Sequence, residues 1–163
     1  MSAMRHWLEY WDYLDRTFWG IFQWFSRDLT SEQVRWQPIR QVASIGWNLQ
    51  HLGEMLDHYL HHVFHATTRP YREVPLVTMQ RHALDDGRFG DLSAIGQYHR
   101  QVRPAYRQVL EKLQESDLDR ALAPGNPRTW AWAIGHIAEH ESYHLGKCTL
   151  LRSLIKHGSV SPG

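Results

Sequence analysis

The hydrophobic residues of this 163-residue chain recur three and four positions apart, a spacing that places them on one face of an α-helix. Four segments carry such an apolar stripe, at about residues 4–25, 44–65, 92–115 and 128–157. No segment alternates convincingly between apolar and polar residues, so no sheet is expected beyond a short hairpin in a connection. Because helices of this length bury their stripes best against one another, the predicted fold is all-α. We expect a four-helix bundle with antiparallel neighbours, in a single domain over residues 1–163.

Residues that start and stop helices mark several of the expected boundaries. Ser44 is suited to cap the second helix, because its hydroxyl can accept a hydrogen bond from a free backbone N–H. Asn126 and Pro127 are interpreted as the cap and first turn of the fourth helix, and Gly158 as its end. Pro104 falls inside the third stripe, where we expect a kink or a break because proline lacks the N–H that a helix needs.

Two of the expected connections are long. Residues 26–43 contain Thr30 and Gln33 at the spacing of a capping box, which predicts one short helical turn. Residues 66–91 form a connection of roughly 25 residues, a length that is unusual in a compact domain and often functional. A connection of this length could close over a functional site as a lid.

Composition and charge narrow the classes of function. The formal net charge is +1, and no basic stripe or reader motif is present, so nucleic acid is not an expected partner. No stretch approaches the ~18 uncharged apolar residues of a membrane helix, and the charged N-terminal stretch is unlike a signal peptide. We therefore expect a cytoplasmic protein with no membrane partner. The 8 tryptophans leave apolar surface for a partner, which favours a homodimer.

The strongest chemical signal lies in the fourth segment, where histidines interrupt the apolar stripe. Extending the stripe from Ile137 by three and then four residues reaches His140 and His144, at positions that the pattern reserves for core residues. Residues four apart lie about 40° apart around a helix and roughly 6 Å apart along it, so the two rings can converge on one ion. One such histidine is usually a hydrogen-bonded core residue, but two at this spacing favour a metal site. His136 reaches too far for the same ion and receives a supporting or structural role.

A third ligand has to come from another helix, and the second segment is rich in histidines. His51 flanks the apolar stripe one turn after Trp47 and can point inward. His58 and His62 share a face nearer the end of that helix, where solvent-exposed positions are expected. Glu54 could be a carboxylate neighbour of the site.

A motif of zinc proteases overlaps these histidines. The run from His140 to His144 matches H-E-x-x-H, in which a zinc protease would use Glu141 as general base. The match fails further on, because metzincins have a glycine and a histidine where this chain has Lys147 and Leu150. No glutamate follows Glu141 to serve as a downstream ligand, so a protease is disfavoured.

Cys148 is the only cysteine of the chain, which excludes an internal disulfide and a cysteine-rich zinc module. It lies one turn beyond His144 and could be a soft fourth ligand. A buried cysteine acting as a small apolar residue is the favoured interpretation.

Two blocks of the sequence carry a family resemblance. The first, from Ser44 to Leu52, follows the pattern Ser-hydrophobic-x-Trp-x-x-x-His-Leu, and Trp36-Gln37-Pro38 precedes it. The second, from His136 to Gly146, follows the pattern H-x-x-x-H-E-x-x-H-x-G. Both resemble blocks of the DinB-like (DinB/YfiT) four-helix-bundle metalloproteins, and the shared helical plan covers nearly the whole chain. Many members continue H-R-G-Q at the end, whereas this chain reads His144-Leu145-Gly146-Lys147.

The resemblance implies a metal held by one histidine of the first block and two of the second. In this chain these are His51, His140 and His144, the same three that the spacing favours. It also implies zinc or nickel as the divalent metal, or sometimes iron. Members of the family include thiol-dependent transferases and isomerases that act on small molecules with a low-molecular-weight thiol.

Several functions remain open at this point. Three protein ligands leave a metal position open for a thiol, water or substrate, so a metal-dependent thiol S-transferase or isomerase is the first hypothesis and a hydrolase the second. Glu141 is the nearest candidate for the catalytic base, and Trp47 and Tyr143 could border the substrate. A non-enzymatic, stress-related binding protein with a structural metal is the alternative, and haem held between histidines is a third interpretation.

Overall fold

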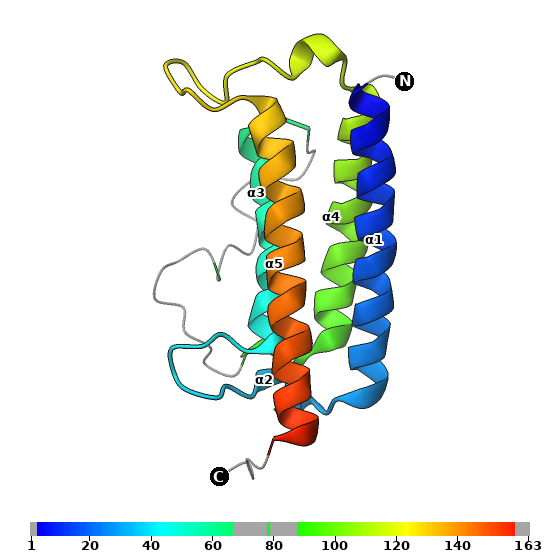
Figure 1. The fold of residues 1–163 in the computed structure, drawn as a ribbon, viewed down its shortest axis with the longest axis vertical. Helices are drawn as coiled ribbons and strands as arrows, with labels where there is room; N and C mark the ends of the chain where they lie inside the picture. The colour runs from blue at the N-terminus through cyan, green and yellow to red at the C-terminus, as the bar shows by residue number, and fades with distance from the viewer. Residues whose placement is uncertain (1–2, 67–77, 79–87, 159–163) are drawn as a thin grey trace.

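The structure is a computed structural model that describes residues 3–66, 78 and 88–158. Within this part of the chain the fold is all-α, as predicted, and the pairing of Ala121 with Thr129 is its only β-type bridge. Figure 1 shows four long helices side by side, namely α1 (Ala3–Asp28), α3 (Ile45–His62), α4 (Leu92–Lys112) and α5 (Trp130–His157). The shorter elements are α2 (Ser31–Arg35), η3 (Arg88–Gly90) and η4 (Glu115–Asp117).

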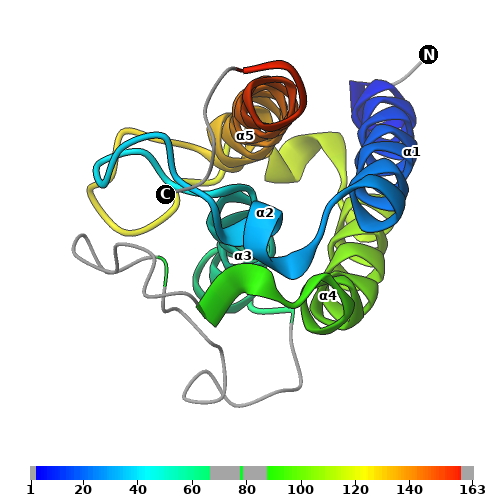
Figure 2. The same cartoon turned by 90° about the horizontal axis from the view of Figure 1, so that it is seen from below.

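The long helices form a square in which α3 packs against α4 and α5, and α1 packs against the same two helices. Figure 2, viewed along the bundle, shows this arrangement with α2 at one end. Figure 1 also shows that α3 and α5 run in opposite directions, whereas α3 and its neighbour α4 run in the same direction. The prediction of antiparallel neighbours is therefore wrong for α3 with α4 and for α1 with α5.

The parallel pair accounts for the length of the connection over residues 66–91. Helix α3 has 18 residues, so the chain has to travel back about 27 Å before α4 can begin beside the start of α3. The prediction that this connection closes over a site falls mainly on residues 67–77 and 79–87, which lie outside the described ones.

Local capping explains where most helices begin. The Ser44 hydroxyl accepts a hydrogen bond from the backbone N–H of Trp47, as predicted, and Thr30 and Gln33 form the predicted capping box of α2. Gly158 ends α5 and donates its N–H to the Leu154 carbonyl.

The start of α5 differs from the prediction. Its N-cap is Thr129, and Asn126 instead accepts a hydrogen bond from the backbone N–H of Arg128 in the preceding turn. The pairing of Thr129 with Ala121 holds this stretch as a short hairpin, so the helix begins three residues after Pro127. The alternative of a break at Pro104 is also wrong, because α4 continues through it from Leu92 to Lys112.

The apolar stripes form two core clusters along the bundle. One is centred on Trp11, Tyr106 and Trp130, and the other on Phe18 and Leu49. Among the described residues, no helix combines the length and the apolar character needed to cross a membrane. Polar side chains are buried in the core as well, and His144 of the candidate site is one of them.

Candidate metal centre

The structure brings His51, His140 and His144 together between α3 and α5. One ligand atom from each of the three lies within 4.8 Å of the others, and no other group of three potential ligands among the described residues is as close. The Nε2 atoms of His51 and His140 are 3.3 Å apart. Bonds of about 2.0–2.1 Å in a tetrahedral zinc site would separate two ligand nitrogens by about 3.3–3.4 Å. The spacing therefore suits a single ion.

Helix geometry produces this arrangement. His140 and His144 are one turn apart on α5, and their ring centroids are 4.4 Å apart. The ring of His51, on the antiparallel helix α3, lies 4.9 Å from each of them. Two rings from one helix and one from its neighbour thus enclose a common point, as the sequence pattern predicts.

The tautomer of His144 is set by a neighbour on α3. Its Nδ1 lies 2.6 Å from Oδ1 of Asn48, an oxygen that can only accept a hydrogen bond. The amide nitrogen of Asn48 donates to the Ser44 carbonyl at 2.6 Å, which fixes the orientation of the amide. Nδ1 of His144 is therefore the protonated nitrogen, and Nε2 carries the lone pair that a metal requires.

His51 also has a polar partner on the nitrogen that faces away from the cluster. Its Nδ1 lies 3.1 Å from Oγ1 of Thr78, whose hydroxyl in turn contacts the carboxylate of Glu54. The Thr78 hydroxyl thus connects Nδ1 of His51 to the Glu54 carboxylate. Such a partner behind a ligand is typical of metal-binding histidines.

All three rings are neutral near pH 7. Burial, followed by the charges of the neighbouring histidines and Lys147, lowers the pKa values of His51 and His140 to about 4. The same causes lower the pKa of His144 to about 2. A histidine must be neutral to bind a metal, so the cluster is in its ligand form across the physiological range.

Aromatic and cationic side chains surround the cluster. The indole of Trp47 stacks on His51 at 4.8 Å, and the exposed ring of Tyr143 lies 5.2 Å from the His144 ring. Lys147 places its ammonium 4.4 Å from the centre of the Tyr143 ring. Aromatic rings and a positive charge therefore both lie close to the cluster.

The structure does not bring Glu141 to the three histidines. The Glu141 carboxylate is buried, and its Oε1 lies 2.8 Å from Nη1 of the Arg103 guanidinium of α4. Arg103 also pairs with Asp15 of α1. Burial raises the pKa of Glu141, and the charge of Arg103 opposes this shift. A catalytic role for Glu141 stays a prediction, and its neighbours are those of a structural ion pair.

The remaining histidines and the cysteine lie outside the cluster. His136 stacks on Trp132 at 4.7 Å, which suits the structural role expected of it. His58 and His62 contact each other at 4.7 Å, further along α3. Cys148 is fully buried in the core, with Sγ 3.8 Å from the Ile45 carbonyl, in agreement with its interpretation as an apolar residue.

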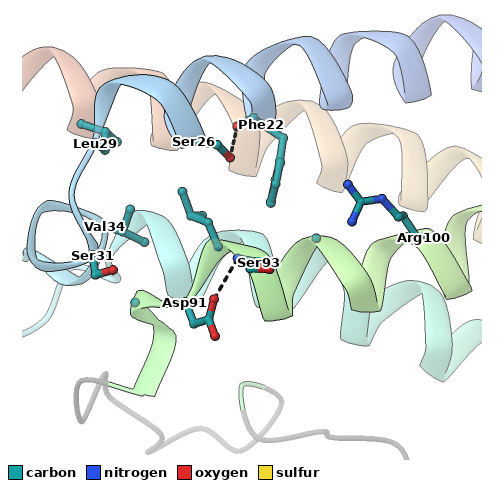
Figure 3. Close-up of a pocket in the computed structure, with 11 residues that line it drawn as sticks. Phe22, Ser26, Leu29, Ser31, Val34, Asp91, Ser93 and Arg100 are labelled. Atoms are coloured by element: carbon teal, nitrogen blue, oxygen red, sulfur yellow. Dashed lines mark hydrogen bonds between the residues drawn. The ribbon is translucent and has the colours of Figure 1, made fainter.

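A separate cavity of about 380 Å³ lies between the end of α1, α2 and the start of α4 (Figure 3). The side chains of Phe22 and Arg100 point into it, and Asp91 accepts a hydrogen bond there from the backbone N–H of Ser93. None of the described residues that line this cavity is a histidine. It is therefore not part of the metal centre.

The fold and the site define an all-α helical bundle with three converging histidines that could hold a metal ion. Comparison with known families narrows this class, because the model of the DinB superfamily matches residues 14–148. The chain belongs to the DinB superfamily. Comparison with curated proteins and with solved structures gives no significant match.

Sequence reasoning found the three histidines but missed two of their partners. Asn48 carries a weak signal, because it is a polar residue one turn before His51 on the inward side of the second stripe. Thr78 carries no signal, because it lies in a connection without helical periodicity.

Proposed function

We propose that His51, His140 and His144 bind one divalent metal, and that the protein uses it to transfer a low-molecular-weight thiol to a small electrophilic molecule. The observation that carries the proposal is the convergence of the three ring nitrogens, two of them 3.3 Å apart. The donor set supports it chemically, because imidazole is a preferred ligand of zinc, nickel and iron. The hydrogen bonds of His51 and His144 leave their Nε2 atoms free for the ion.

The number of protein ligands distinguishes an open metal site from a closed one. Structural zinc usually has four protein ligands, whereas catalytic zinc keeps a position for water or substrate. Among the described residues the cluster contains three candidate ligands and no fourth. When bound, the divalent ion would lower the pKa of a thiol or water at that position and supply a nucleophile near neutral pH.

The residues around the cluster could bind and orient the two reactants. Trp47 and Tyr143 offer apolar surface to an electrophile, and the ammonium of Lys147 attracts an anionic thiol or leaving group. In the transfer, the thiol sulfur forms a bond to the electrophilic carbon, and the leaving group departs with its electron pair. The thiol proton goes to solvent, so this scheme does not require Glu141.

A hydrolase is the second candidate function, because water could occupy the same open position. The non-enzymatic alternative is a stress-related binding protein in which the metal holds α3 to α5. The metal most consistent with the ligands is zinc or nickel, with iron as a further candidate.

The test begins with metal analysis of protein purified without an affinity tag. Metal-loaded protein is then mixed with a panel of small thiols and a chlorinated nitrobenzene, and the rate is compared with those of His140→Ala and metal-stripped protein. His62→Ala is the matched control, because His62 is an exposed histidine outside the cluster. We expect thiol consumption only in the wild type and the control. Equal rates in all samples would reject thiol transfer for these substrates, and absence of metal binding would reject the site itself.

A further inference from the structure

We propose that Glu54 and Thr78 are positioning residues for His51, which they hold in the Nδ1-protonated tautomer with Nε2 turned toward the other two histidines. Glu54 lies on α3 and Thr78 in the connection between α3 and α4. The proposal rests on the proposed metal site, and it adds a prediction about which residues outside the ligand set control that site.

The direction of the hydrogen bonds follows from Glu54. Its fully buried carboxylate accepts hydrogen bonds from the Thr78 backbone N–H at 2.8 Å, the Thr78 hydroxyl at 2.5 Å and the Gln50 side-chain amide at 2.9 Å. The same oxygen, Oε2, accepts from the Thr78 backbone N–H, a group that can only donate, so Oε2 is the acceptor of this pair. The hydroxyl proton of Thr78 must therefore point toward Glu54.

This direction determines the proton on His51. With its own proton directed at Glu54, the Thr78 oxygen has only lone pairs to offer to Nδ1 of His51, 3.1 Å away. Nδ1 must then carry the hydrogen and donate it. The lone pair of the neutral ring resides on Nε2, the atom 3.3 Å from Nε2 of His140.

The cost of this arrangement indicates a functional purpose. A buried carboxylate is expensive to desolvate and is retained only when donors surround it. His144, on α5, obtains the same tautomer from the neutral amide of Asn48 on α3, without a buried charge. His51 instead uses the Glu54 carboxylate together with the hydroxyl of Thr78, a residue 27 positions away from His51 in the chain.

A consequence of the chain of hydrogen bonds is coupling between the metal and Thr78. Metal binding requires the Nδ1-protonated form of His51, which is the form that the docked Thr78 stabilises. By linkage, the metal must stabilise the docked position of Thr78 to the same extent that Thr78 strengthens metal binding.

The first experiment removes only the hydroxyl. Thr78→Val keeps the shape of the side chain, and Thr78→Ser keeps the hydroxyl. Thr17→Val is the control, because the Thr17 hydroxyl donates to the Tyr13 carbonyl of its own helix. We expect Thr78→Val to weaken zinc or nickel binding about 10–100-fold, the usual effect of removing such a partner, in competition with a chromophoric chelator. Thr78→Ser and Thr17→Val should bind as the wild type does.

The second experiment observes the tautomer directly, in metal-free protein. Nitrogen-15 NMR of the His51 ring should show the proton on Nδ1 in the wild type and in Thr78→Ser, and a loss of this preference in Thr78→Val. Glu54→Gln should retain the tautomer, because the amide oxygen still accepts from Thr78, and should weaken metal binding less than Thr78→Val. Hydrogen exchange of the Thr78 amide should slow when zinc is added.

The outcomes separate this proposal from the metal site. If the wild type binds metal through the three histidines and Thr78→Val binds equally well, the positioning role is wrong and the site stands. If the wild type shows the Nδ1 proton but binds no metal, the metal site is wrong. A Thr78→Val protein with the wild-type tautomer would also overturn the positioning role, and circular dichroism confirms that each variant is folded.

Discussion

Helix α5 carries two buried polar sites in adjacent positions of its sequence, and the two treat charge in different ways. His140 faces α3, where three neutral rings converge and one nitrogen of each remains available. Glu141 is rotated by about 100° and points toward Arg103 of α4, where opposite charges neutralise each other. The first site presents three ring nitrogens that could hold an ion, whereas the charges of the second site are paired within the protein. The comparison shows that neighbouring residues of one motif can face different helices and have different partners.

The largest expected effect is the loss of metal from ligand variants. Replacing His51, His140 or His144 by alanine leaves two ligands, so stoichiometric binding should be lost in equilibrium dialysis against zinc or nickel. His62→Ala should retain one ion per chain. A variant of any of the three that still binds one ion tightly would show that the cluster has been assigned incorrectly.

The second prediction concerns the ion pair and is an effect on stability. Glu141→Leu leaves the buried Arg103 with Asp15 alone, and the free energy of unfolding should fall by about 3–5 kcal/mol. Arg103→Met should cost a similar amount, and the double variant less than the sum, as measured by urea denaturation. Folded Glu141→Leu should still bind one metal ion.

The opposite pattern would change the assignment of Glu141. Normal stability together with lost thiol transfer in Glu141→Leu would support the catalytic base that the sequence suggested.

The third prediction is a pH dependence of the metal-free protein. The folded pKa values of His51 and His140, about 4, lie below the value of about 6.5 expected in the unfolded chain. Below pH 6.5 the unfolded chain therefore binds more protons, and the free energy of unfolding should decrease as the pH falls from about 6.5 to about 4. His140→Gln should make this decrease shallower in urea titrations at a series of pH values. An identical slope in both proteins would mean that His140 is not buried as a neutral ring.

The smallest effect is expected at His136. It continues the histidine row but stacks on Trp132, and its ring lies 5.5 Å from that of His140. His136→Gln should leave metal stoichiometry unchanged and shift affinity only slightly in the chelator competition. A loss of binding as large as that of His140→Ala would extend the metal site by one turn.

How much of the candidate site could be predicted depends on whether local sequence or the packing of distant helices sets the position of a residue. His140 and His144 could be found because they occupy positions of an apolar stripe, and a helical period is a local property of the sequence. The partner of Glu141 could not be predicted, because Arg103 is on another helix, and the position of that helix depends on how the bundle is connected.

The same reasoning applies to the topology and to Thr78. The period predicted four helices correctly, but the direction of α4 relative to α3 depends on the path of residues 66–91, which has no periodic signal. Thr78 reaches Glu54 through that same connection, so its role is visible only in three dimensions.

The separation of the ligands along the chain has a consequence for biosynthesis. His51 and His140 are 89 residues apart, and α5 is made after α3. During translation the first ligand is exposed to the cell long before the other two leave the ribosome. All three histidines can therefore surround one ion only after α5 has been made and has packed against α3.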